Sequence, residues 1–215
     1  MRWSDYCDVV RRPLGMFFSC LVAFSVLLTA SLSPSGGAAN RALVRLLLRS
    51  GEQPGYSVSG KTTTSATAAS FIATSGVTGK QKASFTTELK GAGFIVATGE
   101  QLSAPGEVTG FSLVLEFQDA AGASEWVSDE LRLIRDIQGP STILSFKVPG
   151  IGSAKGVLSL NEPVATVNAF WSDDRCVLGA GVYLPNATGY TPAGIEKPVI
   201  QGIKAQSRRI GVRCP

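Results

Sequence analysis

The segment GFSLVLEFQ, residues 110–118, constrains the fold of this chain more than any other because apolar and polar residues alternate along it. The pattern predicts a β-strand. Its four apolar side chains share one face: Phe111, Leu113, Leu115 and Phe117. Ser112 and Glu116 point to the other face, which we expect to meet solvent. Such alternation is typical of an antiparallel sheet with one covered face.

Five other segments have the composition of strands, being short, rich in β-branched and aromatic residues, and bounded by turn residues. They are 94–102, 142–148, 155–160, 165–171 and 175–183. A Pro105-Gly106 turn links the first of them to the strand at 110–118, and a Ser172-Asp173-Asp174 turn joins the last two as a hairpin. Strands joined by such short turns must be antiparallel.

Helices are predicted over 78–94, 120–139 and 196–210. The segment 120–139 has the clearest helical spacing, with one apolar stripe: Ala123, Val127, Leu131 and Ile134. On its outer face, Arg132 is spaced to pair with Asp129 and with Asp136. The order of elements predicts a single α+β domain with an antiparallel sheet of about six strands and helices packed mainly on one face.

Residues 40–77 precede this domain, which we place at 78–215. The stretch 39–51 predicts a short helix with leucines opposite a stripe of arginines: Arg41, Arg45 and Arg49. We interpret it as packing on the domain through its leucines, and the alternative is an amphipathic helix on anionic lipid. The Thr-, Ser- and Ala-rich stretch that follows fits a strand pair or a loose linker.

Residues 1–39 have the features of a secretory signal. A start containing three arginines is followed by the apolar run 16–32, by helix breakers, and by the small residues Ala38 and Ala39. Because the run is close to the length needed to span a bilayer, a retained N-terminal membrane anchor is the alternative. Both interpretations predict export, either as a secreted protein or attached to the outer face of the cytoplasmic membrane.

Two cysteines, Cys176 and Cys214, remain after the leader. In an exported chain they favour a disulfide, which would close a loop of about 40 residues. The alternative is a pair of buried thiols in a cytosolic protein. No histidine is present, so two cysteines alone do not provide an ordinary zinc site, and we predict neither a metal nor a cofactor.

The composition also argues against an enzyme, because the usual general base is missing. The glycine-rich stretch GIGSAKG, 150–156, does not match a phosphate-binding loop and is predicted to be a connection between strands. Ser153 and Lys155 within it form the one nucleophile pair that we retain, as a histidine-free serine hydrolase alternative. The positive charges are not interleaved with aromatic residues, so we predict no nucleic-acid partner.

Trp171 and Tyr183 are candidate ligand contacts. Trp171 is predicted to end a strand beside the hairpin, where an exposed aromatic side chain often contacts ligand. The alternative for Trp171 is that it caps the core.

Three segments carry a resemblance to a known group of proteins: LLLRSGEQPG, FSLVLEFQDAAGASEWV and FKVPGIGSAKG. With the order of elements, the region 42–214 resembles actinobacterial exported and lipoprotein-type α+β domains. In outline it is similar to the extracellular sensor domains of mycobacterial serine/threonine kinases, although its cysteines suffice for one disulfide where those sensors have two. The resemblance implies location and fold, and it implies no catalytic residues.

Together these features predict an exported, non-enzymatic envelope protein, either a ligand-binding domain or a sensor-like accessory. Its partner would be an unknown envelope ligand or protein, and residues 1–39 would attach it to the membrane if they are retained as an anchor. The other alternative is a purely structural envelope protein that binds no ligand.

Overall fold

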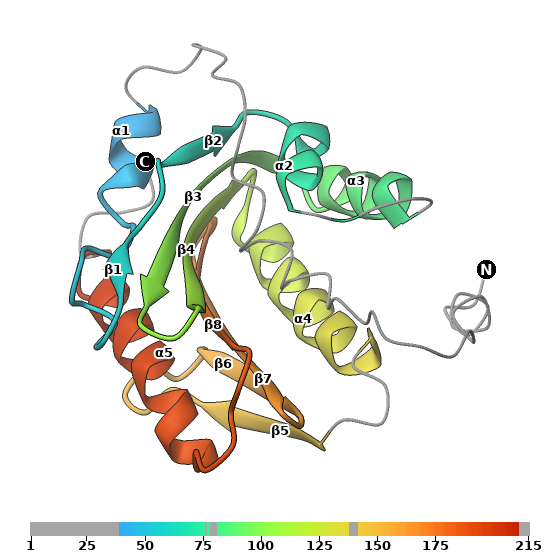
Figure 1. Ribbon diagram of the computed structural model, residues 1–215. Coiled ribbons are helices and arrows are strands. Elements are labelled where there is room, and N and C mark those ends of the chain that lie inside the picture. Colours follow the sequence, from blue (N-terminus) through green and yellow to red (C-terminus); the bar gives the residue numbers. More distant parts are fainter. Residues whose placement is uncertain (1–38, 76, 78–80, 138–141, 211–215) are drawn as a thin grey trace.

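The computed structural model describes residues 39–75, 77, 81–137 and 142–210 (Figure 1). Residues 1–38 of the predicted leader, the last two residues of the predicted helix 120–139 and Cys214 lie outside these residues. Among the described residues, none of the helices combines the length and apolar character needed to cross a membrane.

The described chain forms one antiparallel sheet with helices packed against it. The strands are β1 Ser57–Val58, β2 Thr63–Ser65, β3 Phe94–Ala104, β4 Val108–Phe117, β5 Thr142–Lys147, β6 Lys155–Asn161, β7 Val164–Asp173 and β8 Cys176–Leu184. The helices are α1 Ala39–Val44, α2 Ala68–Thr74, α3 Gln81–Gly91, α4 Ala120–Ile137 and α5 Pro192–Ser207. The predicted α+β class is confirmed.

Neighbouring strands lie in the order β1-β3-β4-β8-β7-β6-β5, and β2 also pairs with β3. All six predicted strands are present, and β1 and β2 lengthen the sheet beyond the six that we expected. The β3–β4 and β7–β8 hairpins form where the turn residues predicted them. Gly106 and Asp174, with φ of 79° and 51°, supply the left-handed backbone that these tight turns require.

Helices cover both faces of the sheet, which is more than the sequence indicated (Figure 1). The α2, α3 and α4 helices pack over the face that carries Leu113 and Leu115. The opposite face is covered by α5 and by the segment that follows α1. Ser112 and Glu116, predicted to meet solvent, are therefore 1% and 5% exposed.

Each of these two side chains has a partner on the covered face. The Ser112 hydroxyl accepts hydrogen bonds from the Leu48 amide and the Gln206 side chain, at 2.9 and 3.1 Å. Glu116 forms an ion pair with Arg175 at 3.0 Å. The prediction therefore placed the side chains of β4 on the correct faces of the sheet. It was wrong in expecting the face with Ser112 and Glu116 to be exposed to solvent.

The N-terminal segment differs from the predicted helix at 39–51. Helix α1 ends at Val44 with Leu43 buried, and the chain continues through turns that bury three more leucines: Leu46, Leu47 and Leu48. Packing of the leucines on the domain, our preferred interpretation, is confirmed. The Thr- and Ala-rich stretch forms β2 and then α2, which begins with a capping box between Thr67 and Ser70.

Three phenylalanine rings lie over glycines on the neighbouring strand. Phe111, Phe146 and Phe170 face their register partners Gly181, Gly156 and Gly179. A side chain at any of these glycines would overlap the ring. The pairs let large rings lie flat against the sheet, so that helices can approach both faces closely.

Candidate functional site

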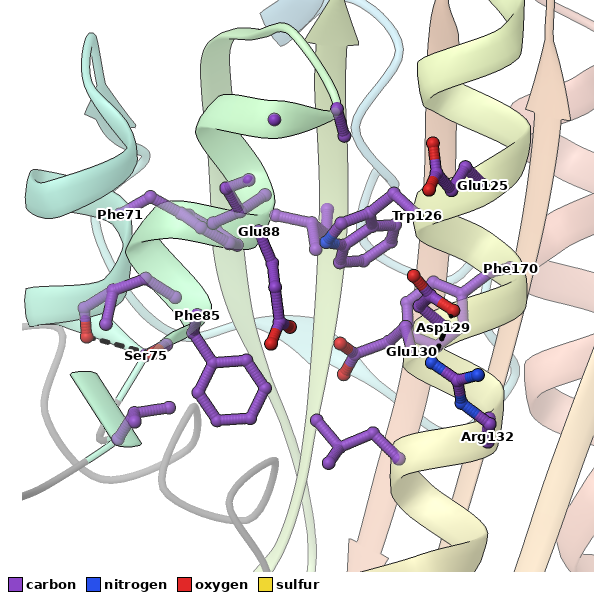
Figure 2. A pocket seen from close by; sticks show the side chains of 17 residues that line it. Phe71, Ser75, Phe85, Glu88, Glu125, Trp126, Asp129, Glu130, Arg132 and Phe170 are labelled. Carbon is purple, nitrogen blue, oxygen red and sulfur yellow. Dashed lines mark hydrogen bonds and ion pairs between the residues drawn. The ribbon is translucent and has the colours of Figure 1, made fainter. Parts of the chain in front are cut away.

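A cavity of about 330 Å³ lies between helices α2, α3 and α4, above the sheet (Figure 2). Helices α2 and α3 form one wall, helix α4 forms the other, and Leu113 and Phe170 of β4 and β7 line it from the sheet. Its volume is in the range of small-molecule sites, which are concave and mostly apolar with a few polar groups. We take it as the candidate functional site.

Aromatic rings run beneath and through this cavity. Phe71 stacks on Phe94, which meets Phe117 edge to face, at centroid separations of 5.7 and 6.1 Å. Trp126 follows, 6.2 Å from Phe117 and 5.4 Å from Phe170. The row links α2, the sheet and α4, and it fixes the orientation of the Trp126 indole at the cavity wall.

Two carboxylates face one another across the cavity. Figure 2 shows Glu88 of α3 and Glu130 of α4 pointing toward each other from opposite walls. Burial raises the pKa of Glu130 to about 7, and the negative charge of Glu88 contributes to the same shift. Burial also raises the pKa of Glu88, although the hydrogen bond that its carboxylate accepts from Ser84 at 3.0 Å opposes this.

The other charged groups that line the cavity are Glu125, Asp129 and Arg132, all on α4. Arg132 donates to Asp129 at 2.7 Å, so the predicted pair is confirmed, and both side chains are about half exposed to solvent. Asp136, the second partner predicted for Arg132, has no described side chain. The cavity therefore has a net negative wall, with its one arginine engaged by a neighbouring acid.

The α4 sequence explains the placement of its cavity residues. The predicted stripe of Ala123, Val127, Leu131 and Ile134 is buried against the sheet. Trp126, Glu130 and Leu133 form a second stripe at i, i+4 and i+7, turned toward α3. Gly122 lets the start of α4 approach the end of α3, because any side chain there would overlap the carbonyl of Ala92.

The aromatic residues predicted as ligand contacts lie elsewhere. Trp171 pairs in register with Leu178, and Tyr183 with Thr166, which places the two aromatic side chains on opposite faces of the sheet. Trp171 is half-buried against the core beside α1 and α5. The described lining of the cavity includes neither Trp171 nor Tyr183, so their role as ligand contacts stays a prediction.

The glycine-rich stretch 150–156 connects β5 to β6 and enters β6, as the sequence predicted. Ser153 and Lys155 are both exposed there, away from the cavity. Asp119, before α4, accepts a hydrogen bond from the Gly122 amide in the first turn of that helix. Within the described ranges, no three His, Cys, Asp or Glu side chains are grouped to hold a metal ion.

Cys176 begins β8 and is completely buried in a cluster with Leu43, Leu178 and Ile210. Cys214 lies outside the described residues, so the Cys176–Cys214 disulfide stays a prediction. The cluster places the end of the described chain beside Cys176, because Ile210 belongs to it.

Sequence reasoning did not find Glu88 or Glu130 as a pair. In the sequence, Glu130 lies next to the buried apolar stripe of α4, which indicates that its side chain is partly buried. The sequence does not indicate which residue faces it. Glu88 comes from a separate helix, and only the packing of α3 against α4 brings the two together.

Comparison with known proteins supports the fold. No protein-family model and no curated protein matches the chain. A solved structure that matches is the extracellular domain of PknH from Mycobacterium tuberculosis, with a TM-score of 0.50 and 16% identity, over 81% of this chain and 98% of that one. The predicted resemblance to extracellular sensor domains of mycobacterial kinases is confirmed at the level of the fold.

Proposed function

We propose that this protein is a non-enzymatic, extracytoplasmic sensor-like domain that binds a small ligand in the cavity between α2, α3 and α4. The observation that carries the proposal is the cavity itself, a pocket of about 330 Å³ lined by aromatic rings and facing carboxylates. A fold shared with an extracellular domain and the predicted leader support the location.

The construction of the cavity favours binding over a purely structural role. A domain is most stable when apolar side chains fill the space between its helices, because the side chains around a void lose van der Waals contacts. Here the α3 and α4 helices instead leave a cavity beside well-packed clusters on both faces of the sheet. Retaining carboxylates in its wall adds a further cost, which a ligand would offset.

A neutral, environment-sensitive dye, N-phenyl-1-naphthylamine, tests the proposal. We expect the full exported chain to bind it with saturable fluorescence enhancement. The variant Leu133→Trp, which fills the cavity from α4, should weaken binding at least tenfold. Leu144→Trp, at a residue 38% exposed on β5, is the matched control and should bind as the parent does.

Circular dichroism melts of the two variants establish that both are folded. Equal dye affinity in the parent chain and in folded Leu133→Trp contradicts the proposed site. Absence of saturable binding in the parent chain contradicts ligand binding by the cavity and favours a structural protein.

A further inference from the structure

Neither of the two facing carboxylates forms an ion pair among the described residues, although the positive charge of Arg132 lowers the pKa of Glu88 against the effect of burial. Among the described residues, no hydrogen bond or ion pair reaches the carboxyl group of Glu130, while Glu88 accepts a hydrogen bond from the neutral Ser84. The one cationic residue in the lining, Arg132, pairs with Asp129. The described lining thus places four carboxylates, Glu88, Glu125, Asp129 and Glu130, against the single guanidinium of Arg132, which leaves an excess of negative charge.

The rest of the wall suits an organic cation. Aromatic faces carry negative electrostatic potential and attract ammonium groups, an effect that increases when water is excluded. Phe85 and Trp126 border the space into which Glu88 and Glu130 point (Figure 2). Carboxylates beside aromatic rings provide both ion pairing and an apolar surface for the body of the ligand.

Other ligand classes fit less well. A calcium ion takes six to eight oxygen ligands, and a magnesium ion keeps several waters that need polar partners. Phenylalanine, leucine and tryptophan around the two carboxylates provide neither. A fatty acid or a phosphate would place a negative charge opposite Glu88 and Glu130, which costs free energy in a partly desolvated space.

We propose that the cavity binds an organic ammonium ion, a protonated primary or secondary amine on an apolar body, whose N–H groups donate to the carboxylates of Glu88 and Glu130. This proposal rests on the proposed function and names the ligand class of that site. The amine lies between α3 and α4, and its apolar body contacts Phe85 and Trp126.

Three probes of nearly equal shape separate charge from size: 2-(1-naphthyl)ethylammonium, 2-(1-naphthyl)ethanol and 1-naphthylacetate. Binding to the full chain is measured by calorimetry at pH 8. We expect the ammonium probe to bind at least tenfold more tightly than the alcohol, and the acetate to bind most weakly. Glu88→Gln and Glu130→Gln should each weaken ammonium binding about tenfold and leave alcohol binding unchanged.

Glu107→Gln is the matched control. Glu107 lies in the turn between β3 and β4, outside the lining of the cavity, so this variant should not change the affinity for the ammonium probe. Equal affinity for the ammonium and the alcohol, both lost in Leu133→Trp, overturns the ammonium proposal and leaves the proposed function standing. Absence of binding by all three probes and by the neutral dye overturns both. An ammonium affinity that is unchanged in Glu88→Gln and Glu130→Gln also overturns the ammonium proposal.

Discussion

Glu130 shows, at the scale of a single residue, how the cavity affects stability. Its pKa is raised from the ordinary value of 4.5 to about 7, so the folded state holds the proton more tightly than the unfolded chain does. The sign follows from linkage: the favourable contribution of protonated Glu130 is complete below about pH 4.5 and is lost as pH rises through 7. The groups facing it are Glu88, Glu125, Asp129 and Arg132.

We expect Glu130→Gln to remove this pH dependence. Relative to the variant, the parent chain should lose about 2 kcal/mol of unfolding free energy between pH 4.5 and pH 8, less than the full shift because the side chain is only half-buried. Urea unfolding at the two pH values measures the difference. Glu107→Gln should track the parent chain, and parallel curves for the parent and Glu130→Gln would show that Glu130 has an ordinary pKa.

Gln53 gives a second prediction at this scale. Its side chain is 1% exposed and lies between Gly110 of β4 and Gly202 of α5. Neither atom of its amide group has a hydrogen-bond partner in the described part of the chain. Because an unpaired buried amide is costly, Gln53→Met, which preserves the shape, should raise the unfolding free energy by about 1 kcal/mol.

Gln206 is the matched comparison for Gln53, since it is equally buried on the same face of the sheet. Its amide nitrogen donates to the Ser112 hydroxyl at 3.1 Å, while its Oε1 has no partner in the described part of the chain, so Gln206→Met removes one hydrogen bond and one unpaired oxygen. We expect the unfolding free energy of Gln206→Met to be about 1 kcal/mol lower than that of Gln53→Met, because only Gln206 loses a hydrogen bond. Loss of stability in both variants, measured by urea unfolding, would indicate that Gln53 is also hydrogen-bonded.

At the scale of elements, the approach of α4 to the end of α3 depends on Gly122. An alanine in a helix interior is normally about 1 kcal/mol more stable than a glycine. Here the added methyl group would overlap the carbonyl oxygen of Ala92, which is backbone and cannot rotate away. Gly122→Ala should therefore lower the unfolding free energy by about 2 kcal/mol and, by moving the helix ends apart, weaken dye binding in the cavity.

Gly91→Ala is the control for this element, because Gly91 ends α3 and a methyl group there meets nothing within 4 Å. It should leave thermal stability unchanged or slightly higher. If Gly122→Ala melts at the temperature of Gly91→Ala, then the two helices are not in contact at this point.

Elements with a strong internal period were predictable from the sequence, and those defined by tertiary contacts were not. Helix α4 matches the prediction because its apolar stripe is continuous. Helix α2 was missed because its Ala- and Ser-rich sequence is stabilised by a capping box and by burial of Phe71 and Ile72. The pattern of segment 39–51 predicts a helix. The helix ends at Val44, however, because Leu46, Leu47 and Leu48 follow one another and could not all face the core from one helix. The cavity could not be predicted from the sequence, because its walls depend on how α3 and α4 are placed relative to one another.

At the scale of the whole molecule, the two ends of the described chain are joined on one face of the sheet. Arg209, just after α5, forms an ion pair with Glu52 and donates to the carbonyl of Leu47. Glu52 in turn accepts from the Arg49 amide at 2.6 Å. Ile210 packs with Leu43 and Cys176 in one buried cluster. The segment after α1 is thus held between the sheet and the end of α5.

This arrangement supports the predicted disulfide. Cys214 follows Ile210 by four residues, a length of chain that spans up to about 13 Å, and Ile210 lies in the same cluster as Cys176. A bond between Cys176 and Cys214 would close a loop of about 40 residues. By lowering the conformational entropy of the unfolded chain, it would stabilise the fold by about 4 kcal/mol. It would also fix α5 over the segment that covers Ser112 and Glu116.

If the chain is exported as predicted, we expect an alkylating reagent to modify neither Cys176 nor Cys214 until the protein is reduced, as counted by mass spectrometry of the digested protein. Reduction should lower the melting temperature, and the double variant Cys176→Ala, Cys214→Ala should melt at that lower temperature whether or not reductant is present. Because Cys176 is buried, slow labelling alone is not sufficient, so the reagent is applied to the unfolded chain in denaturant. Two reactive thiols under those conditions, in protein recovered from outside the cytoplasm, would show that Arg209, Ile210 and the buried leucines hold the two ends together without a covalent bond.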